Sequence, residues 1–132
     1  MPRVDVRLFE HRNLKRDVEI ERASFGKDAW PAEAFVEYGR KSPEFFLIAR
    51  YGRRIVGYSI ARIRWRGAEL DSIAVDPRYR GRGIAQALLD STLASLHSHG
   101  SCMLRLMVST RNAPAVRFYR QYGFVRTRRV RG

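Results

Sequence analysis

The stretch that decides the fold is residues 76–89, DPRYRGRGIAQALL, in which two glycines and three arginines stand directly before an apolar helical pattern. The preceding residues 69–75, ELDSIAV, have the composition of a strand, so the order here is strand, glycine-bearing turn and helix. A helix that begins at glycines leaves its first N–H groups unpaired at the positive end of its dipole. Such an end binds phosphate. The alternative is that Gly81 and Gly83 only shape a surface turn.

Two common phosphate-binding loops do not fit this turn. A Walker A loop requires Lys followed by Ser or Thr after its last glycine, and here Ile84 and Ala85 follow. A dinucleotide fingerprint requires a third Gly or Ala where Gln86 stands, and an acidic residue at the end of the next strand. That position falls in LMVSTRN, residues 106–112, which contains no acid. The sequence therefore excludes both loops.

Length and composition predict one compact domain spanning residues 1–132. The hydrophobic fraction of 45% indicates a globular fold, and no apolar run approaches the roughly 18 residues that span a bilayer. The first residues lack the apolar core of a secretory signal, and a single cysteine rules out an internal disulfide. We therefore expect a cytoplasmic protein that does not act on membranes.

The formal charge of +13 predicts a surface that attracts anions, and residues 100–132 contain no Asp or Glu. Nucleic acid, the ribosome, a membrane surface and phosphorylated ligands all satisfy this condition. The arginine excess is equally explained by genome composition alone. Charge by itself does not distinguish these interpretations.

Hydrophobic periodicity predicts the order β-α-α-β-β-β-α-β-α-β, a mixed α/β or α+β fold class. Expected strands cover residues 4–10, 44–65 (two strands around a turn at 51–53), 68–75, 102–108 and 124–130. Expected helices cover residues 14–24, a segment starting at Asp28 or Pro31, a segment between Gly83 and Gly100, and a segment between Asn112 as N-cap and Gly123.

One pattern does match the turn: Arg or Gln, two residues, Gly, one residue, and Gly or Ala, carried by Arg80, Gly83 and Ala85. Residues 111–124, RNAPAVRFYRQYGF, add a second motif, Asn-x-x-Ala-x-x-x-Tyr-x-x-x-Gly-Phe. Together they resemble the GNAT superfamily of acyl-CoA-dependent N-acetyltransferases. The resemblance implies a mostly antiparallel sheet with helices on both faces, and an enzyme that moves an acetyl group from acetyl-CoA to an amine.

Residues 20–35, IERASFGKDAWPAEAF, are similar to the loop between the first two helices of the bacterial ribosomal-protein N-terminal alanine acetyltransferases. This similarity implies a protein or peptide N-terminal α-amine as acceptor, with the ribosome as a candidate partner. Phe25, Trp30 and Phe35 are equally suited to be ordinary core anchors.

The resemblance also assigns the acetyl-CoA contacts. Main-chain amides of residues 81–85 would hold the pyrophosphate, and the strand edge would pair with the pantetheine arm. A main-chain N–H near Val75 would face the thioester oxygen. The residues implied are Ile73, Ala74, Val75, Arg80, Gly81, Arg82, Gly83, Ile84, Ala85 and Asn112.

Tyr119 falls at the family position whose phenol protonates the departing thiolate, although the same residue is suited to be a packed aromatic. The glutamate that the alanine acetyltransferases carry before their motif asparagine is Met107 here, and a thioether cannot accept the amine proton. We therefore expect Glu69 to be the base. Asp71 is the alternative, and it faces the same way as Glu69 provided that no bulge intervenes.

We assign no metal, since His97 and His99 are two residues apart on a helix and diverge. Two alternatives to a peptide acetyltransferase stay open: an enzyme for small-molecule amines, and a non-catalytic module that senses acyl-CoA or binds RNA or the ribosome. Monomer and homodimer are both open. The family normally adds a seventh strand, whereas the sequence stops at Gly132, inside or just after the sixth. A partner chain, another architecture or a shortened chain would each account for that.

Overall fold

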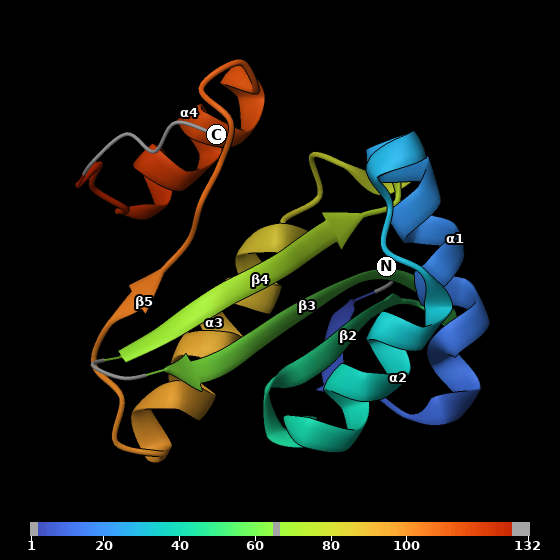
Figure 1. Ribbon diagram of the computed structural model, residues 1–132. Coiled ribbons are helices and arrows are strands. Elements are labelled where there is room, and N and C mark those ends of the chain that lie inside the picture. The colour runs from blue at the N-terminus through green and yellow to red at the C-terminus, as the bar shows by residue number, and fades with distance from the viewer. Residues whose placement is uncertain (1–2, 65–66, 128–132) are drawn as a thin grey trace.

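The computed structural model describes residues 3–64 and 67–127. These residues form five strands and four α-helices in the order β1-α1-α2-β2-β3-β4-α3-β5-α4 (Figure 1). The strands are β1 (Val4–Leu8), β2 (Phe46–Tyr51), β3 (Arg54–Arg64), β4 (Gly67–Val75) and β5 (Leu104–Arg105). The helices are α1 (Leu14–Phe25), α2 (Ala32–Lys41), α3 (Ile84–Ser98) and α4 (Ala113–Tyr122).

The five strands form one sheet in the order β1-β2-β3-β4-β5. The first three pairings are antiparallel. A tight turn at Gly52, whose φ is 65°, joins β2 to β3, whereas α1 and α2 lie between β1 and β2. β5 returns after α3 and pairs with β4 in parallel, the arrangement that a crossover helix allows. The sheet is therefore mostly antiparallel, with one parallel pair at the β5 edge.

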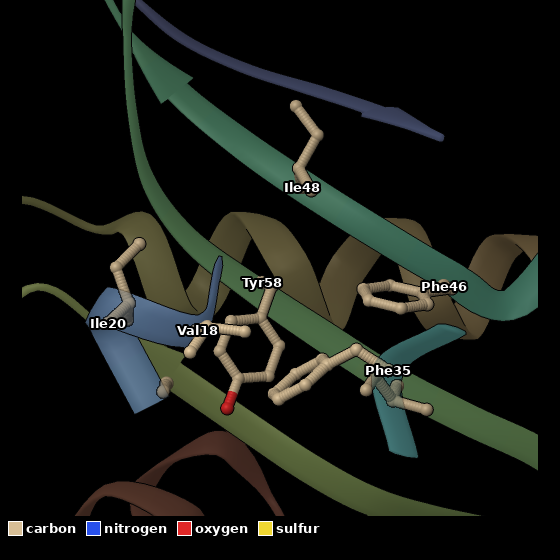
Figure 2. Packing of buried hydrophobic residues seen from close by; sticks show 8 residues of the cluster. Val18, Ile20, Phe35, Phe46, Ile48 and Tyr58 are labelled. Carbon is tan, nitrogen blue, oxygen red and sulfur yellow. The ribbon is translucent and has the colours of Figure 1, made fainter. Parts of the chain in front are cut away.

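Helices cover both faces of the sheet (Figure 1). α1 and α2 pack on one face, where Phe35 meets Tyr58 edge-on with ring centroids 5.3 Å apart (Figure 2). α3 packs on the other face through Ile84, Leu88 and neighbouring leucines. This two-sided burial explains why β2 and the middle of β3 are apolar at nearly every position.

α3 lies unusually close to the sheet at Gly57. A Cβ at this position would lie 2.9 Å from the carbonyl oxygen of Ala74 and 3.3 Å from side-chain atoms of both Ile84 and Leu88. Glycine therefore lets the first turns of α3 rest on β3 beside the end of β4. That contact fixes where the glycine-bearing turn lies relative to β4.

The fold class predicted from the sequence is confirmed, and so are all four helices. The side chain of Asn112 caps α4 by accepting a hydrogen bond from the N–H of Ala115 at 3.2 Å. Gly123 ends that helix at a φ of 124°. α2 begins directly after Pro31, one of the two starts considered.

Two predicted strands are wrong in extent. Instead of residues 102–108, β5 covers only Leu104–Arg105, because the chain then leaves β4 and runs toward α4 (Figure 1). Residues 124–127 are not in a strand. Phe124 instead turns back onto α4, where its N–H donates a hydrogen bond to the Tyr119 carbonyl at 2.9 Å. The rest of the predicted last strand lies outside the described residues.

None of the helices in residues 3–64 and 67–127 is long and apolar enough to span a bilayer.

Candidate active site

β4 has an edge that is only partly paired. On the β5 side, its partners are Leu104 and Arg105, which face Ala68 and Glu69. Within the described chain, no strand pairs with β4 beyond Glu69 on that side, whereas β3 pairs with β4 as far as Val75 on the other side. The main-chain groups that β4 directs to this side from Ile73 to Val75 can therefore accept an extended ligand as an additional strand.

The glycine-bearing turn follows this edge directly. Gly81 and Gly83 have φ angles of 79° and 78°, and a Cβ at either position would meet nothing within 4 Å. No side chain caps α3, whose N-cap is Gly83. The first N–H groups of α3 thus lie at an open, positively polarised helix end, as phosphate binding requires.

Asp76 fixes the junction between β4 and the turn. Its carboxylate accepts a hydrogen bond from the N–H of Arg78 at 3.0 Å and pairs with the guanidinium of Arg16 at 2.5 Å. Arg16 in turn donates to the carbonyl of Ile55 at 2.9 Å. The Arg78 side chain, the Arg78 N–H and Arg16 together hold the pKa of Asp76 well below its usual range. The turn is therefore tied to α1 and β3.

The two predicted cationic residues at the rim, Arg80 and Arg82, are both exposed. The Arg82 guanidinium lies 5.2 Å from the ring centroids of both Tyr51 and Tyr79, a distance typical of cation–π contact. Ile84 is buried beneath the turn and Ala85 is half-buried. These two residues can contribute only main-chain groups and packing to a bound anion.

Tyr119 lies half-buried on α4, between Phe118 and Phe124 at ring distances of 5.4 and 5.6 Å. It packs against the same apolar cluster as Ile73 of β4. Burial raises the pKa of Tyr119 to about 12, so its phenol keeps its proton throughout the neutral range. Tyr119 is thus a proton donor on the side of the sheet where α4 lies.

Tyr122, one turn further along α4, has a different role. Its hydroxyl donates to the Asp90 carboxylate on α3 at 2.5 Å, and this bond ties α4 to α3. Among the described residues, Tyr119 has no such hydroxyl partner. Of the two tyrosines, Tyr119 is therefore the one whose hydroxyl is available for chemistry.

Glu69 and Asp71 lie on the face of the sheet that α2 covers. A bulge does intervene, because the register changes from Ile60 opposite Ser72 to Ala61 opposite Leu70 and leaves Asp71 between. Both carboxylates nevertheless pair with Arg62, at 3.8 Å for Glu69 and 2.5 Å for Asp71.

The two carboxylates differ in access to solvent. The Glu69 side chain is 36% exposed, and its other contact is an ion pair with Arg64 at 3.4 Å. The Asp71 side chain is only 11% exposed and also accepts a hydrogen bond from Tyr38 at 2.8 Å. Glu69 is therefore the more accessible base, and Asp71 is the more constrained one.

Met107 and Asn112 lie on the segment that joins β5 to α4. Met107 is 80% exposed and stands outside β5, so its side chain borders solvent. Asn112 is exposed, with its side-chain oxygen engaged in capping α4. Only its amide nitrogen remains as a donor for a ligand. No group of three His, Cys, Asp or Glu side chains with the arrangement of a metal site occurs in residues 3–64 and 67–127.

Several polar residues near β4 were not anticipated from the sequence. Tyr38 binds Asp71, and Tyr58 places its hydroxyl 3.3 Å from Ser72. The sequence predicts that a tyrosine in an apolar strand such as β3 is a core residue, and only the three-dimensional structure shows its polar partner. Of these residues, only buried Glu21 could have been found from the sequence, because it lies in the segment similar to the alanine acetyltransferases.

A partly paired strand edge, a glycine turn that begins a helix, and a half-buried tyrosine fit one class of protein: an enzyme that binds a phosphate-bearing, extended cosubstrate and transfers a group from it. Residues 12–124 match the Acetyltransferase (GNAT) family, so the chain belongs to that family. The expectation of an acetyl-CoA-dependent N-acetyltransferase is confirmed.

Individual relatives agree with this assignment. The chain is 33% identical to the N-alpha-acetyltransferase RimI of Mycobacterium tuberculosis over 93% of its own length and 79% of the relative's. Its structure is similar to that of Ard1 from Thermoplasma volcanium, with a TM-score of 0.89, 28% identity, and coverage of 95% and 84% of the two chains. It is also similar to the diaminobutyrate acetyltransferase EctA from Paenibacillus lautus, solved with its substrate and coenzyme A, with a TM-score of 0.82, 25% identity, and coverage of 92% and 75%.

Proposed function

We propose that this enzyme acetylates the α-amine of a protein or peptide N-terminus, with acetyl-CoA as the acetyl donor. The observation that carries the proposal is the unpaired edge of β4 leading directly into the open N-terminus of α3. The similarity to an N-alpha-acetyltransferase supports the choice of acceptor.

In this proposal, acetyl-CoA lies along β4. Main-chain groups of Ile73, Ala74 and Val75 pair with the pantetheine arm, as one more strand would. The N–H groups of residues 81–85 hold the pyrophosphate. Arg80, Arg82 and the amide nitrogen of Asn112 supply the side-chain donors.

The chemistry requires one bond to form and one to break. The neutral amine attacks the thioester carbonyl carbon, and a main-chain N–H near Val75 stabilises the oxyanion that develops there. The tetrahedral intermediate then collapses as the C–S bond breaks, and the phenol of Tyr119 gives its proton to the thiolate. The amine nitrogen loses one proton to water or to a base, which balances the proton that the thiolate gains.

The proposed base is Glu69, acting through water. Its exposure leaves room for a water molecule between the carboxylate and the amine, and its ion pairs with Arg62 and Arg64 hold the carboxylate at the sheet surface. A weak base suffices for an α-amine, whose reference pKa is about 7.7 to 8.0, but not for a lysine amine near 10.4. The exposed Met107, which cannot accept a proton, therefore favours an α-amine.

The net charge of +13 supports a negatively charged environment for the acceptor. Ribosome association is one such environment, and we propose it as the setting of the reaction. Sedimentation with ribosomes at two salt concentrations tests this part, because an electrostatic association weakens as salt rises.

A second candidate acceptor is a small diamine, supported by the similarity to the diaminobutyrate acetyltransferase. A peptide panel that pairs free and blocked N-termini with free and blocked lysines, run beside diaminobutyrate, separates the two. Acetylation of the peptides with free N-termini is the expected result. Acetylation confined to lysine side chains or to diaminobutyrate would contradict a peptide N-terminus as the acceptor.

A non-catalytic module that only senses acyl-CoA or binds RNA makes a different prediction. Such a module would release no free thiol from acetyl-CoA in the presence of any amine. We expect thiol release that depends on the peptide acceptor.

A further inference from the structure

A buried carboxylate joins the connection between α1 and α2 to the sheet. Glu21 on α1 is 2% exposed and accepts hydrogen bonds from the main-chain N–H of Trp30, at 2.8 Å, and from the hydroxyl of Tyr58 on β3. That hydroxyl lies 3.3 Å from Ser72 Oγ on β4. The polar groups therefore form a continuous chain from Trp30, just before α2, to β4.

The ring of Trp30 starts a second route to the same strand. It stacks on Tyr38 with centroids 5.3 Å apart and an interplanar angle of 9°. The Tyr38 hydroxyl donates to Asp71 at 2.8 Å. The two routes thus end at adjacent residues, Asp71 and Ser72, where the bulge interrupts the pairing of β3 and β4.

Before Trp30, the α1–α2 connection is exposed. Residues 26–28 form one turn of 3-10 helix with no buried residue, and Phe25 before them is 41% exposed. The first point at which the connection is anchored by a buried polar group is the Trp30 N–H. Because a buried carboxylate is costly unless it is fully bonded, this anchor depends on both partners of Glu21.

We propose that Glu21 is a positioning residue for the acceptor: by bonding Trp30 and Tyr58 together, it sets the distance between the α1–α2 connection and the bulge of β4. The inference rests on the proposed function, in which the acceptor amine meets a thioester held along Ile73–Val75. Glu21 does not itself touch the reacting atoms, because it lies in the core between α1 and β3.

The main test compares Glu21→Ala with Glu21→Gln. Glutamine keeps an oxygen for the Trp30 N–H and can donate to the Tyr58 oxygen, whereas alanine leaves the Trp30 N–H without this acceptor and leaves the Tyr58 hydroxyl with Ser72 alone. We expect Glu21→Ala to raise the acceptor KM about tenfold or more, with the acetyl-CoA Kd unchanged, and Glu21→Gln to restore most of the wild-type KM. Glu19→Ala is the matched control, since Glu19 is exposed on the same helix.

If Glu21→Ala does not fold, the same measurements are made on Tyr58→Phe. This change keeps the ring in the core and removes one of the two hydrogen bonds to Glu21. We expect a smaller increase in acceptor KM, again without a change in acetyl-CoA affinity. A folded Glu21→Ala or Tyr58→Phe variant with the wild-type acceptor KM overturns the inference. Parallel losses of acceptor and acetyl-CoA affinity also overturn it, because they indicate general damage.

Amide hydrogen exchange of residues 26–30 separates this inference from the proposed function. We expect faster exchange in Glu21→Ala, near-normal exchange in Glu21→Gln, and no change in Glu19→Ala. If the enzyme acetylates only a small diamine, the proposed acceptor fails, yet the kinetics with that amine and the exchange experiment still test Glu21. Exchange that does not respond to Glu21→Ala overturns the inference whichever amine is used.

Discussion

The two edges of β4 differ in what completes them. Along one edge, β3 pairs with β4 from Gly57 opposite Val75 to Arg64 opposite Gly67. Along the other, β5 supplies Leu104 and Arg105, and the chain then departs toward α4 (Figure 1). Within the described residues the first edge is paired along its whole length, whereas the second is paired only at Ala68 and Glu69, and we propose that acetyl-CoA completes it.

The difference indicates that the two sides of β4 contribute unequally to stability and to activity. Main-chain hydrogen bonds and the packing of α1, α2 and α3 stabilise the β3 side. On the β5 side, α4 has no buried residue, and its Tyr122 bonds Asp90 on α3. Apart from the acceptor effect proposed for Glu21, we therefore expect changes on the β3 side to act on folding, and changes at Tyr119 and along the other edge of β4 to act on catalysis.

The largest effect that we expect is on the β5 side. Tyr119→Phe should lower kcat by about 10²- to 10⁴-fold, the usual contribution of a general acid, while the acetyl-CoA Kd stays unchanged. Because burial raises the pKa of Tyr119 to about 12, the loss should be the same at every pH from 6 to 9. Steady-state kinetics together with calorimetry measure both quantities.

Tyr122→Phe is the matched control on the same helix. It removes the bond to Asp90, so it should lower the thermal midpoint and leave kcat nearly unchanged. Wild-type turnover in Tyr119→Phe, or equal kcat losses in the two variants, would contradict the assignment of Tyr119 as proton donor.

The second effect belongs to the β3 side, where Asp17 on α1 is fully buried and neither carboxylate oxygen is hydrogen-bonded. Burial raises the pKa of Asp17 to about 8. The folded state then holds a proton that the unfolded state loses above about pH 4, so stability falls as pH rises through this window.

Asp17→Asn removes this titration. Relative to wild type, the variant should gain about 3 kcal/mol in free energy of unfolding between pH 5 and pH 7, since one proton changes stability by roughly 1.4 kcal/mol per pH unit. Urea unfolding at several pH values measures the difference. A difference between the two proteins that is independent of pH would show that Asp17 ionises normally.

The third effect sharpens the role of the glycine turn. Gly83→Leu should weaken acetyl-CoA binding about 10- to 100-fold, because the side chain fills the space in which the pyrophosphate would approach the first N–H groups of α3. Calorimetry with acetyl-CoA measures the change. Gly100→Leu carries the same left-handed strain, with a φ of 84° against 78°, at the other end of α3. Equal losses of affinity in both variants would point to strain instead of a phosphate site.

The smallest effect concerns the base. Glu69→Gln should cost about tenfold in kcat/KM near pH 7 and progressively less as pH rises, because more of the α-amine is then neutral without help. Asp71→Asn, at the more constrained carboxylate, serves as the comparison. An unaltered pH–rate profile in Glu69→Gln together with a changed one in Asp71→Asn would assign the base to Asp71.

Local signals in the sequence predicted most of the fold. The glycines at 81, 83, 100 and 123 mark the ends of α3 and α4, and each has a positive φ that few other residues adopt. Family resemblance added the mostly antiparallel sheet with helices on both faces. These features depend on residues close together in the chain, so a single sequence is enough to predict them.

Other features depend on contacts between distant residues. The largely apolar composition of residues 102–108 suits a full strand, yet only two of them pair with β4, because the length of a strand depends on its neighbour. The bulge at Asp71 likewise arises from how β3 and β4 align. The bond from Tyr58 to Glu21 joins residues 37 positions apart, and no local pattern predicts it.

The half-paired edge of β4 also has a consequence for solubility. An unpaired strand edge offers donors and acceptors to any extended polypeptide, including a second copy of the same chain, and proteins usually protect such edges with charge, bulges or cover. Here the bulge lies at Asp71, and no strand within residues 3–64 and 67–127 pairs with Ile73 to Val75 on that side. Acetyl-CoA bound along this edge would therefore also protect the protein from self-association, and the protection would be lost when acetyl-CoA dissociates.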